Sequence, residues 1–271
     1  MEMDKDLKIA LKAAREGVKT IKEFQSKKLN IREKGFHDLV TDADIATEKT
    51  ILGIIKEHFP DDEILAEESE NEEVLSDKRT WIVDPIDGTT NFAHQFPVFC
   101  VSVALWEKKK PKVGVVIEVN RHEEFTAVAG EGAWLNGEKI SVSGKTKPRN
   151  AFVGTGFPYN DLSLVDPYLK MFRHLMEKLQ GMRRPGAATF DLCCVACGRF
   201  DGFYEYSLHA WDVAAAALIV QEAGGTVTDW NGESGWLFGQ RIIAGNPDIH
   251  QYLLKCIEEY IPEKQRKNIT H

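Results

Sequence analysis

The sequence has few cysteines and no long run of apolar residues. The longest apolar run covers residues 96–106 and contains Ser102, whereas a membrane-spanning helix needs about 20 such residues. The first residues mix both charge signs and lack the apolar segment of a secretory signal peptide. Five cysteines in a chain that starts this way indicate reduced thiols, so we expect a cytoplasmic protein without membrane contacts.

Positive charge is also scarce, with 34 Lys and Arg against 42 Asp and Glu and a formal net charge of −8. Non-specific binding to nucleic acid or to anionic membranes requires clustered basic residues, so we expect no nucleic-acid partner. Hydrophobic residues make up 43% and charged residues 28% of the 271 residues. These proportions are typical of a globular protein and exclude a disordered or collagen-like chain.

Helices are predicted by apolar residues at steps of three or four. One such stripe covers residues 7–24. Thr41 followed by Asp44 resembles a capping box and predicts a second helix, which Pro60 ends. Further helices are expected at residues 164–179, 189–197, 212–223 and 247–260.

Strands are predicted by short β-branched or alternating apolar runs between turn residues. In the first half, short strands at 64–66 and 81–83 precede an antiparallel meander over residues 98–129, and Asn136 with Gly137 forms a hairpin turn. In the second half, strands alternate with helices and are expected at residues 151–154, 203–206, 226–229 and 242–244. Residues 27–34 are polar and predict a connector.

This order of elements predicts an α/β fold of layered helices and sheets. No internal repeat or linker divides the chain, so we expect a single domain over residues 1–271. It would consist of an N-terminal α+β half over about 1–145, a C-terminal α/β half over about 146–262 and a polar tail at 263–271.

The strongest chemical signal is the string DPIDGTTN at residues 84–91. A buried strand leads directly into Asp84 and Asp87, Pro85 fixes φ between them, and Gly88 allows a sharp turn. The amides after Gly88 would open a short helix, whose N-terminus favours an anion. Hard oxygen ligands beside an anion site suit Mg²⁺ and phosphate. For a bare D-P-x-D motif, an Asp-capped turn without function is an equal alternative.

Further carboxylates follow other predicted elements. Glu67 and Glu68 come after the strand at 64–66, and Asp212 opens an apolar helix, where its structural role would be that of an N-cap. Carboxylate, carbonyl and water ligands favour Mg²⁺ or Mn²⁺, and no pair of histidines has the spacing of a zinc site. The sequence therefore predicts a magnesium site built from strand and helix ends.

Four motifs stand in the order and spacing of the inositol monophosphatase family, which the chain resembles from about residue 34 to residue 246. They are DLVTDAD at 38–44, EES at 67–69, DPIDGTTN at 84–91, and WDVAAA with EAGG at 211–225. TGFPY at 155–159 and the pair Arg183 and Arg184 resemble bacterial members. The resemblance implies a five-layer αβαβα sandwich of the inositol monophosphatase and fructose-1,6-bisphosphatase type. It also implies a homodimer that requires Mg²⁺, accepts Mn²⁺, and is inhibited by Li⁺ and Ca²⁺.

The resemblance implies two or three metal ions in each subunit. The implied ligands are Glu67, Asp84, the carbonyl of Ile86, Asp87, Thr89 and Asp212. Asp84 would bridge the first two ions, and Glu67 with waters would hold a weaker third. The implied contacts of the phosphate ester are Gly88, Thr89, Gly186, Ala187, Glu205 and Asp212. Of these, the amides of Gly88 and Thr89 would bind the phosphate, and Glu205 would contact the alcohol.

The implied reaction is the hydrolysis of a phosphomonoester by in-line attack of a water between two metals. Glu67 and a Thr89–Asp44 pair would be catalytic, because they would help to activate that water. No cysteine or serine nucleophile is needed, so we expect no phosphoenzyme. Lys34 lies four residues before Asp38, whereas family members often have a lysine about five residues before this motif, which leaves its role near the third metal or the phosphate open.

Several substrates and one different class of function fit this pattern. The favoured substrate is myo-inositol 1-phosphate or a similar small polyol or sugar phosphate. The same chemistry would serve fructose-1,6-bisphosphate, histidinol phosphate or a 3′-phosphoadenosine nucleotide. A regulatory or RNA-associated protein that retains the fold is the alternative from another class, although the intact acidic residues favour catalysis.

Overall fold

The computed structural model describes residues 4–27, 29–35, 38–69, 74–159 and 161–267. Its helices are α1 (Lys5–Gln25), α2 (Asp42–His58), α3 (Thr89–Ala93), α4 (Val165–Lys178), α5 (Ala188–Ala196), α6 (Ala210–Glu222), α7 (Pro247–Tyr260) and α8 (Glu263–Arg266). Its strands are β1 (Ile31–Gly35), β2 (Asp38–Thr41), β3 (Glu63–Ala66), β4 (Thr80–Asp87), β5 (Cys100–Glu107), β6 (Lys110–Glu118), β7 (Glu123–Val128), β8 (Gly132–Leu135), β9 (Glu138–Ile140), β10 (Phe152–Thr155), β11 (Gly181–Arg183), β12 (Gly202–Tyr206), β13 (Thr226–Thr228) and β14 (Arg241–Gly245). None of these helices is both long enough and apolar enough to span a membrane.

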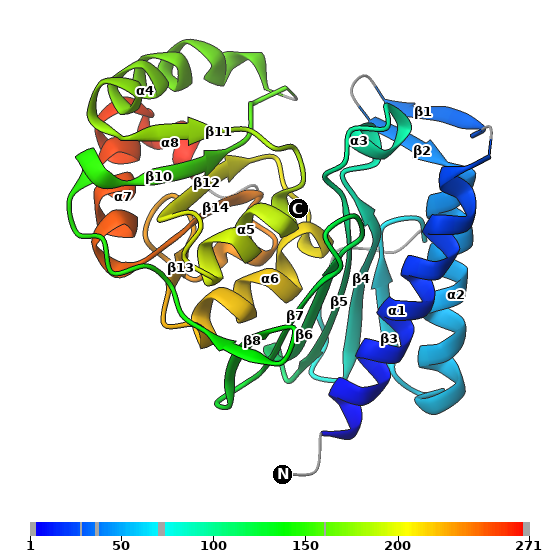
Figure 1. Cartoon of the computed structure of the whole chain (residues 1–271). Coiled ribbons are helices and arrows are strands. Elements are labelled where there is room, and N and C mark those ends of the chain that lie inside the picture. The colour runs from blue at the N-terminus through cyan, green and yellow to red at the C-terminus, as the bar shows by residue number, and fades with distance from the viewer. Residues whose placement is uncertain (1–3, 28, 36–37, 70–73, 160, 268–271) are drawn as a thin grey trace.

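The elements stack in five layers, as Figure 1 shows. Helices α1 and α2 cover one face of the sheet β3-β4-β5-β6-β7-β8-β9, and α5 and α6 lie between that sheet and a second one, β11-β10-β12-β14-β13. Helices α4 and α7 cover the outer face of the second sheet. The five-layer αβαβα fold that the sequence predicts is therefore confirmed.

The register of β3 and β4 brings two candidate site residues, Glu67 and Asp84, close together. These strands are parallel, and Ala66 pairs with Val83. Since parallel strands end at the same edge of a sheet, Glu67 and Asp84 leave their strands side by side. The other neighbours in this sheet are antiparallel, as the predicted meander requires.

Helix α6 reaches the centre of the molecule because its residues are small. Alanines at 214–217 are buried in a hydrophobic core that also contains Val116 of the first sheet and Phe203 of the second. A Cβ atom on Gly114 of β6 would lie 2.6 Å from the carbonyl oxygen of Ala215, so only glycine permits this approach. The shared core supports the prediction of a single domain, which stays a prediction.

Four local expectations need correction. Residues 27–34 are not wholly a connector, because β1 pairs with β2 in an antiparallel hairpin. The edge strand β11 was not expected, and it pairs in parallel with β10. Helix α6 begins at Ala210 rather than at Asp212, and α8 lies in the predicted polar tail.

Candidate metal centre and active site

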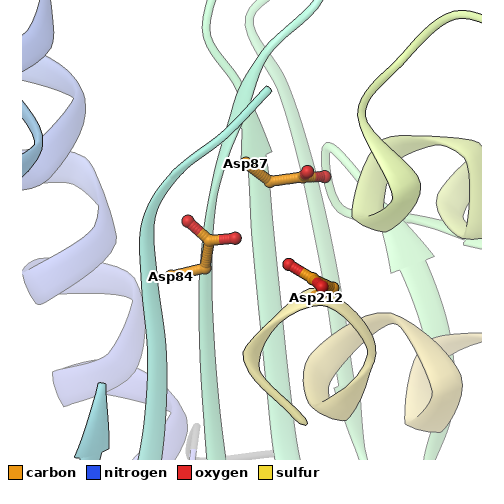
Figure 2. A group of neighbouring side chains, drawn as sticks. All are labelled: Asp84, Asp87 and Asp212. Atoms are coloured by element: carbon orange, nitrogen blue, oxygen red, sulfur yellow. The ribbon is translucent and has the colours of Figure 1, made fainter. Parts of the chain in front are cut away.

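Three carboxylates meet where β4 ends and α6 begins. Each of Asp84, Asp87 and Asp212 offers an oxygen, and these oxygens all lie within 4.8 Å of one another. Figure 2 shows the side chains of the two β4 residues and of Asp212 converging on one point. Residues more than 120 positions apart in sequence are thus brought to one small volume.

Burial makes this cluster unfavourable unless a cation joins it. Asp84 and Asp87 are 1% and 8% exposed, and neither forms an ion pair with a basic residue in the part of the chain that the structure describes. Burial, together with the charges of Glu67, Asp87 and Asp212, raises the pKa of Asp84 well above its ordinary value. Burial and the charge of Asp212 raise the pKa of Asp87 to about 7. Such a donor set fits a hard divalent cation, which would replace the missing positive charge.

Backbone donors fix the orientation of both β4 carboxylates. The Ile86 N–H donates to Asp84 Oδ1 over 2.9 Å, so this hydrogen bond spans Pro85. The Thr189 N–H, at the start of α5, donates to Asp87 Oδ2 over 2.7 Å. One oxygen of each carboxylate is thereby held by the backbone.

Asp212 is the third residue of α6 and not its N-cap. His209 is the N-cap, and its N–H donates to Asp212 Oδ2 over 2.7 Å in a capping-box arrangement. The predicted structural role of Asp212 is therefore wrong in detail. The same hydrogen bond sets the carboxylate at the positive end of the helix dipole, facing β4.

Glu67 stands beside the cluster, at the end of β3. Its N–H donates to the Val83 carbonyl oxygen over 3.2 Å, and its carboxylate is close enough to Asp84 to raise the pKa of that residue. The next turn is held by Glu48 of α2, which accepts from the Glu68 N–H over 2.8 Å and from the Ser69 hydroxyl over 2.6 Å.

Glu48, whose carboxylate holds the turn that follows Glu67, was not identified from the sequence. Asp44 and Glu48 lie one helical turn apart in the buried stripe of α2, which continues with Ile51 and Ile55. Two acidic residues at buried positions of an amphipathic helix are a signal that could have identified it.

We expect Glu48→Ala to weaken Mg²⁺ binding by about ten- to a hundredfold, as for other residues that orient metal ligands. The Glu68 N–H and the Ser69 hydroxyl would lose their acceptor, and the turn that follows Glu67 would no longer be held in place. Calorimetric titration with Mg²⁺ measures the change. Glu57→Ala, an exposed substitution on the same helix, is the control. Equal Mg²⁺ affinity in Glu48→Ala and wild type would contradict this role.

Gly88 makes the turn from β4 into α3. Its φ of 94° is in the left-handed region, and a Cβ there would lie 3.0 Å from the Val98 carbonyl oxygen. The hydroxyl of Thr89 then lies 3.0 Å from both Asp44 Oδ1 and the Ile86 carbonyl oxygen, and donates its proton to one of them. Burial raises the pKa of Asp44. The hydrogen bonds from Thr41 and Thr89 lower this pKa, but the effect of burial is larger.

A cleft of about 510 Å³ opens beside the cluster. Its lining residues are Glu33, Gly35, Leu39, Glu67, Gly88, Thr89, Thr90, Tyr159, Arg184 and Gly186. The predicted contacts Gly88, Thr89 and Gly186 therefore share one cavity. The predicted contact Ala187 is 1% exposed and is not among the residues that line this cleft. The side chain of Lys34 lies outside the described residues.

Asn91 fastens the segment after the Gly88 turn to the opposite wall of the cleft. Its side-chain amide donates to the carbonyl oxygens of Val98, Pro185 and Gly186 over 2.8, 3.0 and 3.2 Å, using two protons among three acceptors. The DPIDGTTN string contains this asparagine, but two of its three partners, Pro185 and Gly186, are remote in sequence. Glu222 of the EAGG motif is likewise structural, because it accepts from the N–H groups of Gly130 and Gly132.

Glu205, at the end of β12, lies near the cluster as predicted for an alcohol contact. Burial and the charges of Asp212 and Asp87 raise its pKa to about 8, against the opposing charge of Arg184. The structure thus brings together the metal-ligand candidates, the Thr89–Asp44 pair and Glu205, whose roles stay predictions.

Comparisons with known proteins show what this chain is similar to. The model of the inositol monophosphatase family matches residues 2–262. The Nus factor SuhB of Pseudomonas aeruginosa is 42% identical, over 96% of this chain and 98% of that protein. An inositol monophosphatase of Dictyostelium discoideum is 38% identical, over 95% and 96%. The crystal structure of the extragenic suppressor protein SuhB of Bartonella henselae superposes with a TM-score of 0.91 at 36% identity, covering 95% of this chain and all of the other.

Proposed function

Since this chain belongs to the inositol monophosphatase family, we propose that it is a Mg²⁺-dependent phosphomonoesterase that acts on inositol monophosphate and similar small polyol phosphates. The observation that carries the proposal is the cluster of the buried Asp84 and Asp87 with the half-buried Asp212, in which Asp84 and Asp87 form no ion pair with a basic residue among the described residues. The cluster adjoins a cleft wide enough for a sugar-sized ester.

The candidate ligands Glu67, Asp84, Ile86 through its carbonyl, Asp87, Thr89 and Asp212 would hold two or three divalent cations. Bound cations supply charge neutralisation of the phosphate and a more acidic water. The amides of Gly88 and Thr89 would bind phosphate oxygens. The Thr89 hydroxyl, which lies between Asp44 Oδ1 and the Ile86 carbonyl oxygen, would keep its proton in a hydrogen bond to one of them and accept a hydrogen bond from the attacking water, which it thereby orients. Glu67 would accept the proton that this water loses.

A panel of small phosphate esters tests this proposal. We expect Mg²⁺-dependent release of phosphate from myo-inositol 1-phosphate, weaker activity with Mn²⁺, and inhibition by Li⁺ and Ca²⁺. Fructose-1,6-bisphosphate, histidinol phosphate and 3′-phosphoadenosine nucleotides complete the panel and rank the alternatives. No Mg²⁺-dependent release from any of these esters would contradict the proposal.

The relatives named Nus factor SuhB favour a second candidate, a role in transcription. The two roles are separable, because a binding surface does not require the buried carboxylates. We expect Asp84→Asn to lose phosphatase activity and to retain any binding to a purified transcription complex, measured by co-elution with that complex. No co-elution of the wild-type protein would remove this candidate.

We also propose that the protein is a homodimer, with α4 at the interface. Apolar residues recur at the coiled-coil spacing of three and four along one side of α4 and of the turn before it, at Leu162, Val165, Leu169, Phe172 and Met176, of which Val165 and Phe172 are half-buried. Leu162, Leu169 and Met176 are 78%, 52% and 63% exposed. In an antiparallel pair of α4 helices centred on Leu169, Asp166 of one copy would face Arg173 of the other, so the surface is complementary to itself.

We expect Leu169→Glu to convert a dimer into a monomer, because it places two charges at the centre of that pair. Light scattering after size exclusion measures the mass, and Val74→Glu, a substitution of another exposed apolar residue, is the control. A Leu169→Glu protein that remains dimeric would place the interface elsewhere, and a monomeric wild type would exclude the dimer.

A further inference from the structure

The carboxylate of Glu205 occupies space that is empty only because residue 156 is glycine. Strands β10 and β12 are parallel, and Thr155 pairs with Tyr204, so Gly156 and Glu205 follow as neighbours. A Cβ atom on Gly156 would lie 1.6 Å from Glu205 Oε1 and 1.9 Å from its Cδ. Neither distance is physically attainable, so any side chain at position 156 displaces this carboxylate.

The backbone at Gly156 is held firmly and cannot relieve that contact at low cost. Its carbonyl oxygen accepts from the hydroxyl of Tyr168, which is 1% exposed. The Thr155 hydroxyl lies 2.5 Å from the Tyr168 hydroxyl and 3.0 Å from the Tyr204 carbonyl oxygen. This buried network ties the end of β10 to α4 and to β12, so the flexible Glu205 side chain is the part that must move.

No described donor on the neighbouring α5 holds Glu205 instead. The acidic residue there is Asp191, which is 1% exposed and whose Oδ1 has no hydrogen-bond partner among the described residues. It lies close enough to feel the charge of Glu205. A carboxyl group on that side offers repulsion, and the charge of Arg184 attracts Glu205, but the carboxylate can take its present direction only because the space above Gly156 is empty.

We propose that Gly156 is a specificity-determining position: by lacking a side chain it places the Glu205 carboxylate where it accepts hydrogen bonds from hydroxyls next to the phosphate ester. The inference rests on the proposed phosphatase function, in which Glu205 is the implied contact of the alcohol, and it adds the residue that sets the direction of this carboxylate. Gly156 acts only through Glu205 and has no contact of its own with the reacting atoms.

Kinetics of Gly156→Ala test this assignment. We expect KM for myo-inositol 1-phosphate to rise about ten- to a hundredfold, as for the loss of a hydrogen bond to a charged group. We expect kcat to change less than about threefold, and activity on ethyl phosphate, which has no neighbouring hydroxyl, to stay at the wild-type level. Gly53→Ala is the matched control, because a Cβ there meets nothing within 4 Å.

A double-mutant cycle with Glu205→Ala separates this role from a general loss of stability. In the Glu205→Ala background, Gly156→Ala should change neither KM nor the melting temperature, because the carboxylate that the new methyl group would meet is absent. Gly156→Ala alone should lower the melting temperature, and a crystal structure should show Glu205 displaced. If the single variant fails to fold, recovery of folding in the double variant is the expected result.

Two results would overturn the inference: wild-type KM values in Gly156→Ala, or an equal effect of Gly156→Ala with and without Glu205. A failure of this inference about Gly156 is distinguishable from a failure of the proposed phosphatase function. If the wild-type protein releases phosphate and the cycle shows no coupling, only the inference falls. If no ester is hydrolysed, the phosphatase function and the specificity role fall together, whereas the contact between residues 156 and 205 is still measured by melting temperature.

Discussion

Asp84→Asn is expected to lower kcat at saturating Mg²⁺ by at least about a thousandfold. Asparagine keeps the shape of the side chain but removes the negative charge that two cations would share. Interactions of this kind contribute several kcal/mol to the transition state, and each 1.36 kcal/mol corresponds to a factor of about ten in rate. Phosphate release from myo-inositol 1-phosphate measures the loss.

The same substitution is expected to lower activity but to raise the stability of the metal-free protein. In metal-free buffer, Asp84→Asn should melt at a higher temperature than the wild-type protein, because it removes a buried charge beside Asp87 and Asp212. Added Mg²⁺ should stabilise the wild type and leave the variant nearly unchanged. Asp248→Asn, on the surface of α7, is the control for both measurements. Near-normal turnover in Asp84→Asn would contradict the assignment of Asp84 as a shared ligand.

The free energy of unfolding of the metal-free protein is expected to fall as the pH rises from about 4 to about 7. The pKa of Asp87 is raised from 3.8 to about 7 in the folded protein, so the native state holds a proton that the unfolded chain releases. Between these two values the native state binds more protons, and stability therefore decreases with pH. Asp84, whose pKa is also raised, changes stability in the same direction.

Urea unfolding at pH 5 and pH 8, with EDTA or with Mg²⁺, measures this dependence. Saturating Mg²⁺ should reduce the fall in the free energy of unfolding between these two pH values, because the cation replaces the proton as the partner of the carboxylates. Asp87→Asn in EDTA should lose part of the dependence. If wild type and Asp87→Asn show the same change with pH in EDTA, the cluster does not control stability in this way.

The sequence predicts the site best where its residues are contiguous. Asp84, Asp87, Gly88 and Thr89 form one string, and the strand, turn and short helix that they require are all present. Asp212 was a candidate because it opens a helix, and the family resemblance added its role as a ligand of the same metal, but no local pattern predicts its distance from residues so far away in the sequence. The long helices and strands were predictable because the spacing of their apolar residues repeats several times within each element.

The remaining features depend on tertiary contacts. Strand β1 reads Ile-Arg-Glu-Lys-Gly and lacks the alternation of a half-buried strand, so its pairing with β2 has no local signal. The hydrogen bonds of Glu48 and the need for glycine at position 156 appear only once β3, β10 and β12 are in place. Position 156 is noticeable in the sequence only as one glycine of the TGFPY segment.

Diffraction at a wavelength that excites manganese is the most direct test of the central claim, that the carboxylates of Asp84, Asp87 and Asp212 bind the catalytic cations. In crystals grown with millimolar Mn²⁺, the account predicts a strong anomalous peak among these three side chains, and its loss in Asp84→Asn. Under the same conditions, an absence of any peak there, or an unchanged peak in Asp84→Asn, would contradict it.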